Sequence, residues 1–177
     1  MIRYIHDGIS ADSITQAYEE FKSLNLWGGP SVYFHGKTIS HLRQQQQLAD
    51  FSYVSLLQDE YFLLLLYGTL AAWGLHRMGG KRRMVGFDVF KDEVNSLADV
   101  LSDIKGITLS QSTPNQISDR KEQICFILQE PRITEGVDNA SRQNNWVPFL
   151  VANSKLLHHL YPDLFPPVDG QHILRYF

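Results

Sequence analysis

Apolar residues recur along most of this chain at the three- and four-residue intervals of an α-helix. The clearest run covers residues 53–78, is apolar on nearly every face and stops at a pair of glycines. A helix without a polar face must be surrounded by other elements. We therefore expect one long buried central helix, in which Leu64→Ala costs about 2–5 kcal/mol. Its mostly buried side chains should be those of Leu57, Tyr61, Leu64, Leu65, Trp73 and Leu75.

Weaker patterns predict further helices over residues 13–25, 88–105, 113–129 and 146–160, and a short terminal helix that Asp169 caps. Thr113, Pro114 and Gln116 have the spacing of a capping box with proline in the first turn, and Gly106 is a helix stop. Residues 41–49 are typical of a short polar helix, 31–39 of an extended segment or short strand, and 133–145 of a loop. Many helices and one candidate strand predict an all-α fold, with residues 1–177 forming a single compact multi-helix domain around the long buried helix.

Composition limits the class of protein. The net charge of −3 gives no general attraction to nucleic acid or acidic membranes, so any such contact needs a local patch. Cys125 is the only cysteine, which excludes an internal disulfide and fits a reducing, cytoplasmic location. The uncharged stretch 61–75 is shorter than the roughly 20 residues that span a bilayer. We expect no contact with a membrane.

The familiar catalytic and cofactor motifs are absent from the sequence. It has no glycine-rich phosphate loop, no His-Glu-x-x-His, no paired cysteines and no Gly-x-Ser-x-Gly. The seven histidines include no pair four residues apart. His158 and His159 are adjacent, so on a helix they point about 100° apart and cannot chelate one ion by themselves. We expect neither a metal site nor a cofactor.

A basic cluster follows the central apolar run and comprises His76, Arg77, Lys81, Arg82 and Arg83. Cations at the C-terminal end of a helix oppose the negative end of its dipole, which accounts for Arg77 and Lys81 structurally. Arg82 and Arg83 lie beyond the glycine pair, where a patch that contacts phosphates is the alternative. Both interpretations stay open at this stage.

Two C-terminal segments carry a family resemblance. Residues 151–155 read Val-Ala-Asn-Ser-Lys and residues 166–169 read Pro-Pro-Val-Asp. Together they are similar to the C-terminal half of the helix-hairpin-helix DNA glycosylase superfamily, which makes 146–177 a glycosylase-like hairpin segment. The resemblance implies that a turn at Ser154 and Lys155 holds a DNA phosphate and that Asp169 is the catalytic carboxylate. The family's Gly-x-Gly turn is replaced here by Ala-Asn-Ser, which favours binding over catalysis.

The chain as a whole also resembles a group of bacterial proteins. They share the sequence Trp-Gly-Leu-His-Arg-Met-Gly at residues 73–79 and the segment from Ser154 to Asp169. This second likeness implies no particular activity.

Three functions follow from these features. The first is a nucleic-acid-binding module without catalysis, whose contacts would be Ser154, Lys155, Arg77, Lys81, Arg82 and Arg83. In that case Ser154 and Asp169 should share a cleft, with at least one of Arg77, Lys81, Arg82 and Arg83 nearby. The second is an enzyme that processes a nucleobase or nucleotide with Asp169, beside an aromatic pocket of Trp73, Tyr161 and Phe165. The third is a protein-interaction component or homo-oligomer.

Overall fold

The computed structural model describes residues 30–75, 82–136 and 147–168, and these residues form an all-α fold with one small sheet. The predicted helices at 13–25 and from Asp169 lie outside the described residues. The described elements are α2 (Pro30–Gln46), α3 (Tyr53–Gln58), α4 (Glu60–Ala72), β1 (Arg82–Met84), α5 (Phe87–Asn95), α6 (Ala98–Asp103), α7 (Pro114–Ser118), α8 (Lys121–Gln129), β2 (Thr134–Gly136) and α9 (Val147–Leu160).

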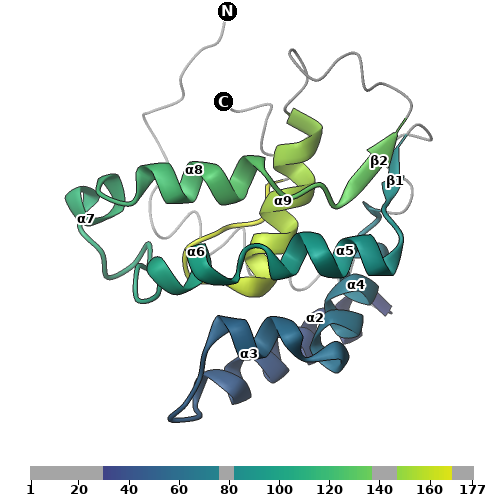
Figure 1. The fold of residues 1–177 in the computed structure, drawn as a ribbon, viewed down its shortest axis with the longest axis horizontal. Coiled ribbons are helices and arrows are strands. Elements are labelled where there is room, and N and C mark those ends of the chain that lie inside the picture. Colours follow the sequence, from purple (N-terminus) through teal and green to yellow (C-terminus); the bar gives the residue numbers. More distant parts are fainter. Residues whose placement is uncertain (1–29, 76–81, 137–146, 169–177) are drawn as a thin grey trace, which may run out of the picture.

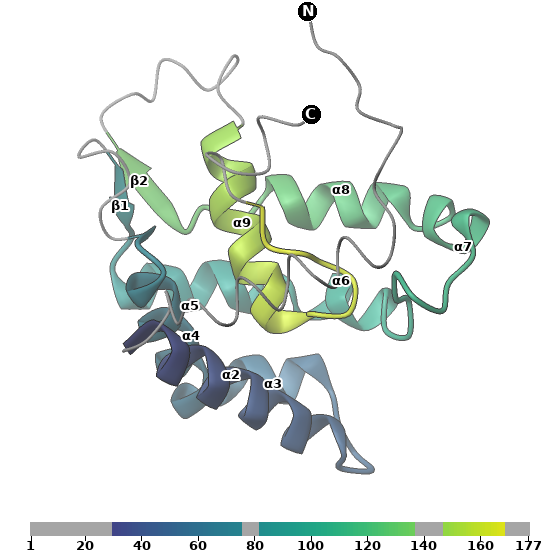
Figure 2. The same ribbon diagram turned by 180° about the vertical axis from the view of Figure 1, so that it is seen from behind.

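The helices are arranged in three layers. In Figure 1, α8 runs along one side, α5 and α6 occupy the middle, and α2, α3 and α4 lie on the other side. The opposite view shows α9 crossing the first two of these layers and reaching α2 and α4 (Figure 2). Strands β1 and β2 pair antiparallel at one end, with Arg83 opposite Glu135. The predicted helix at 146–160 is confirmed, because α9 covers it almost entirely.

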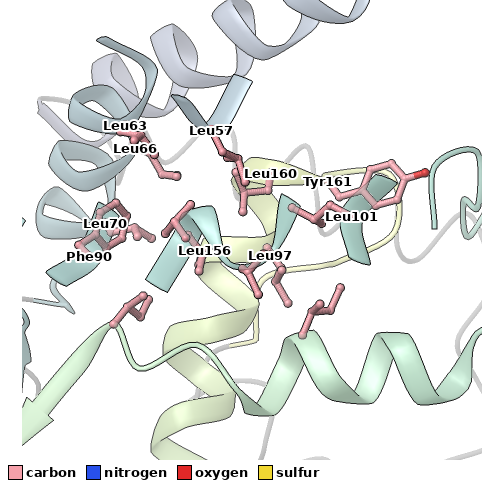
Figure 3. Close-up of a cluster of buried hydrophobic side chains, with 14 of the residues drawn as sticks. Leu57, Leu63, Leu66, Leu70, Phe90, Leu97, Leu101, Leu156, Leu160 and Tyr161 are labelled. Atoms are coloured by element: carbon pink, nitrogen blue, oxygen red, sulfur yellow. The ribbon is translucent and has the colours of Figure 1, made fainter. Parts of the chain in front are cut away.

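The hydrophobic core lies where α9 meets α3, α4, α5 and α6. Figure 3 shows leucines from these helices pointing toward one another, with the Tyr161 hydroxyl at the edge of the cluster. That hydroxyl donates to the Ile104 carbonyl at 3.0 Å and accepts from the Gly106 amide at 2.6 Å. It fixes the turn after α6, where Gly106 has φ +92°. The core includes Leu57, Leu63, Leu66, Leu70, Phe90, Leu97, Leu101, Leu156 and Leu160.

The prediction of one continuous helix over 53–78 is wrong. Asp59 has extended backbone angles of φ −74° and ψ 105°, so it ends α3 and begins α4. Its carboxylate accepts from the Tyr61 amide at 3.0 Å and from His41 Nε2 at 2.9 Å. A carboxylate that caps one helix and bonds to another favours the break over a straight continuation.

Two side chains predicted to be buried in that helix are exposed. Tyr61 is 58% and Leu64 is 52% exposed, while Leu65 and Trp73 are half-buried. Leu57 and Leu75 are buried, as predicted. α4 covers the core with one face and leaves part of its apolar surface open. Leu64→Ala should therefore cost much less than the 2–5 kcal/mol expected of a core position.

The predicted strand at 31–39 is also wrong, because α2 is one helix from Pro30 to Gln46. Its inward positions include the buried side chains of Thr38 and Leu42, which are four residues apart. That spacing suits a helix packed against a neighbour and not the two-residue repeat of a strand. Proline at its first position is compatible with a helix start.

Of the smaller predictions, the structure confirms one and corrects the others. The capping box is confirmed: Thr113 accepts from the Gln116 amide and the Gln116 side chain accepts from the Thr113 amide. The helices expected over 88–105 and 113–129 are each interrupted, giving α5 with α6 and α7 with α8. The expected loop over 133–145 contains β2, whose pairing with β1 depends on residues distant in the sequence. Within the described ranges, no helix is both long and apolar enough to cross a membrane.

A buried pair of threonines joins α2 to α4. The Thr69 hydroxyl donates to the Leu65 carbonyl at 2.7 Å, so its oxygen is left to accept from Thr38 at 2.7 Å. Both side chains are fully buried. Nearby, the Phe34 ring of α2 lies 3.5 Å from where a Cβ on Gly68 would be, so α2 and α4 approach closely at this glycine.

Removing the Thr38 donor should lower the free energy of unfolding. We expect Thr38→Val to cost about 1 kcal/mol, because it keeps the side-chain volume and leaves one buried acceptor short of a partner. The double variant Thr38→Val/Thr69→Val should cost less than the sum of the single changes. Urea denaturation of the four proteins measures this coupling. Additive costs would show that the two hydroxyls do not interact.

Candidate functional site

The expected phosphate-binding turn at Ser154 and Lys155 is not formed. Both residues lie in the middle of α9, where the backbone is helical. Ser154 is only 2% exposed; its hydroxyl donates to the Val151 carbonyl at 3.1 Å and accepts from the Val168 amide at 3.0 Å. A buried hydroxyl with both roles occupied has no access to a phosphate. The backbone amides of a helix interior are likewise engaged within the helix.

The remaining residues of the expected site are only partly described. Arg77, Lys81 and Asp169 lie outside the described residues, so the shared cleft and the helix cap at Asp169 stay predictions. Arg82 contributes its backbone to β1. Arg83 is exposed, but its Nε donates to the Glu135 carboxylate at 2.7 Å across the sheet. That carboxylate balances the charge of Arg83, which makes it a weaker phosphate contact than the sequence suggested.

The expected aromatic pocket is not assembled either. Tyr161 and Phe165 are buried, and the Tyr161 ring contacts those of Tyr53 and Phe165. Its hydroxyl is used in the turn after α6, as described above. The ring contacts of Trp73 are instead with three histidines. Trp73 therefore belongs to a different group of side chains.

A cluster of four rings, which we call the histidine cluster, is the most distinctive polar feature of the described structure. His35 comes from α2, Trp73 from the end of α4, and His158 and His159 from α9. The rings of His35, Trp73 and His158 lie within 31° of parallel, with centroids 5.3 to 6.0 Å apart. His159 is fully buried and stands at 73° to 82° to all three.

Hydrogen bonds within the histidine cluster determine which ring nitrogens carry protons. His159 Nδ1 lies 2.7 Å from the Lys155 carbonyl, which can only accept, so this nitrogen carries the proton. In the neutral ring His159 Nε2 is then bare, and it accepts from His35 Nδ1 at 3.0 Å. His158 Nδ1 donates in the same way to the Phe165 carbonyl at 3.0 Å. It follows that Nε2 of His35 and Nε2 of His158 are both bare acceptors.

Burial keeps these imidazoles neutral. Loss of solvent lowers the pKa of His159 from 6.5 to about 3. The hydrogen bond to the Lys155 carbonyl opposes this shift to a smaller extent, and His158 and His35 add to it. Burial also lowers the pKa of His35, assisted by His158, and that of His158 itself. At neutral pH the histidine cluster therefore presents hydrogen-bond acceptors and no positive charge.

The histidine cluster does not make a metal centre by the usual criterion. Among the described residues, no group of three or more histidine, cysteine, aspartate or glutamate side chains could hold a metal ion. The rings of the adjacent His158 and His159 meet edge to face, with centroids 5.3 Å apart and planes at 80°.

A second candidate surface is the outward side of α2, which we call the α2 outer face. It carries Lys37 and Arg43, both exposed, and α2 contains no aspartate or glutamate. Lys37 Nζ lies 5.6 Å from the centroid of the exposed Tyr33 ring. In order along the helix, the exposed residues of this face are Val32, Tyr33, Gly36, Lys37, Ser40, Arg43 and Gln44.

Sequence reasoning missed both features for different reasons. The α2 outer face was hidden by the wrong assignment of 31–39 as extended, although the absence of acidic residues over 30–46 was visible. His35 is 124 positions from His159, and no local pattern predicts their contact. Comparisons of the chain with family models, curated proteins and solved structures find no match.

Proposed function

We propose that this protein is a nucleic-acid-binding module that contacts phosphates through the α2 outer face. The observation that carries the proposal is the charge of α2. The whole chain has 19 acidic residues and a net charge of −3, yet the 17 residues of α2 include two cations and no carboxylate. An acidic protein that binds a polyanion must concentrate its cations on one surface.

The side chains of the α2 outer face suit this role. Lys37 and Arg43 are exposed cations six positions apart, and neither forms an ion pair with another described residue. Gln44 is exposed beside Arg43; arginine and glutamine are the residue types that pair with guanine and adenine edges in the major groove. Gly36, just before Lys37, and Ser40, between the two cations, are both small, so a nucleic-acid backbone can approach the helix closely.

The position of α2 in the fold also supports the proposal. It lies at the margin of the α2–α3–α4 layer, with its inner side against α4 and its outer side free of other described elements (Figure 2). At 1.5 Å per residue a helix of this length extends about 25 Å. An α-helix fits the major groove of B-form DNA, which makes duplex DNA the form that the α2 outer face suits best.

The salt dependence of binding tests this proposal. We expect Lys37→Gln/Arg43→Gln to weaken duplex binding and to reduce the slope of log K against log salt by up to about 1.8, since each neutralised phosphate contributes about 0.9. Fluorescence anisotropy with a labelled duplex and with a labelled single strand, from about 50 to 200 mM salt, measures both effects.

A matched control removes the same charge from another surface. Arg120→Gln/Lys121→Gln changes two exposed cations at the start of α8, where Asp119 and Glu122 flank them. This control should leave affinity and salt slope near those of the wild type. If the wild type binds neither nucleic acid at the lowest salt, or if both double variants lose binding equally, the α2 outer face is not a nucleic-acid interface.

A further inference from the structure

The histidine cluster has a chemistry that the proposed function does not use. His35 points to the inner side of α2, away from Lys37 and the rest of the α2 outer face, and reaches α9. We propose that His35, Trp73 and His158 form a binding site for a flat heteroaromatic ligand that donates N–H hydrogen bonds. The edge of a guanine base, with two adjacent N–H donors, is the chemistry that such a site would recognise.

The positions of the ring protons determine which ligands the site can bind. The Nδ1 atoms of both rings already donate hydrogen bonds, that of His35 to His159 Nε2 and that of His158 to the Phe165 carbonyl. No hydrogen bond from the described residues reaches Nε2 of either ring. The two half-buried rings therefore offer lone pairs and no polar hydrogens. Such a site attracts N–H donors, whereas phosphate or carboxylate would need the donors that it lacks.

The arrangement of the rings favours a flat ligand. His35 and His158 are 5° from parallel, with centroids 5.8 Å apart, and Trp73 is tilted by 31° and 26° from them. The Nε2 lone pairs lie in the planes of these rings, so a flat ligand that donates to them meets the rings edge to edge. All three groups are half-buried, so each keeps some contact with the surface.

The site is also held rigid before any ligand binds. His158 is fixed by Phe165, and His35 is fixed by His159, whose own ring is anchored to the Lys155 carbonyl. Lys155 Nζ lies 3.5 Å from the Trp73 carbonyl and joins α9 to the end of α4. A binding group that is held by a second set of contacts loses little freedom when the ligand arrives.

Nitrogen NMR on the full chain tests the proposal directly. Long-range proton–nitrogen spectra distinguish a bare ring nitrogen from one that accepts a hydrogen bond. Titration with guanosine should shift the Nε2 signals of His35 and His158. The Nε2 signal of His41, which also lies on α2 but bonds to Asp59, should stay in place and serves as the internal control.

Ligand analogues and one variant define the contact further. Inosine, which lacks the exocyclic amine, should bind more weakly than guanosine, and His158→Phe should weaken guanosine binding by about tenfold because the ring stays while the acceptor is lost. Thermal unfolding of His158→Phe checks that the fold is kept. Lys37→Gln/Arg43→Gln should bind guanosine like the wild type, so this site and the nucleic-acid proposal can fail separately.

Three results would overturn the inference. Nε2 signals that do not respond to millimolar guanosine would show that the rings are only structural. Equal binding of guanosine by folded His158→Phe would show that the acceptor is not used. A shift with Zn²⁺ but with no nucleoside would show that the two bare nitrogens receive a metal ion instead.

Discussion

Replacing Leu66 by alanine should lower the free energy of unfolding by about 2–5 kcal/mol. Leu66 is fully buried on α4 and belongs to the core cluster that α9 closes. Truncation removes its transfer free energy and leaves a cavity, because the neighbouring leucines come from different helices and cannot all move inward together (Figure 3). Urea denaturation followed by circular dichroism measures the change.

Leu64→Ala is the matched control for this prediction. It makes the same chemical change two positions earlier on the same helix, where the side chain is 52% exposed. We expect it to cost less than about 1 kcal/mol, in line with other surface substitutions. A Leu64→Ala cost equal to that of Leu66→Ala would mean that α4 presents a different face to the core.

The fold class was predictable because local signals and packing agree over most of the chain. The capping box at Thr113 satisfies amides within its own turn, so its pattern survives any tertiary context. The break at Asp59 was less visible, since an aspartate inside an apolar run can be a solvated interruption or a cap. Its carboxylate bonds to His41 on another helix, and that contact is absent from the local sequence.

The expected turn at Ser154 and Lys155 is not formed, because tertiary contacts use the neighbouring side chains differently. Asn153 and Ser154 are typical of turns, where they bond to nearby backbone. Here the Asn153 amide donates to the Leu128 carbonyl of α8, and Ser154 bonds within α9 and to Val168. These partners stabilise a helix that the residue types alone disfavour. Side chains that meet from distant segments, such as those of the histidine cluster, leave no comparable pattern in the sequence.

Acid should destabilise the protein through the histidine cluster well before most carboxylates are protonated. The pKa of His159 is about 3 in the folded protein, because burial excludes the charged ring, and near 6.5 when the chain unfolds. Above pH 6.5 neither state binds the proton and the full stability is present. Below it the unfolded state binds a proton that the folded state excludes, so stability falls by about 1.4 kcal/mol per pH unit down to the folded pKa.

The groups that face His159 either lower the stability in acid in the same way or carry no charge. His35 from α2 and His158 from α9 also have lowered pKa values, Trp73 from the end of α4 is uncharged, and the Lys155 contact is through its carbonyl. We expect the unfolding free energy to fall by about 2 kcal/mol between pH 6.5 and pH 5 from His159 alone. Urea denaturation across this range measures the slope.

The variant His159→Gln tests whether His159 causes this acid sensitivity. Its amide can donate to the Lys155 carbonyl and accept from His35, so both hydrogen-bonding roles are kept while the titrating ring is removed. We expect it to reduce the slope by about 1 kcal/mol per pH unit or more. A variant with the wild-type slope would show that the acid sensitivity arises elsewhere in the chain.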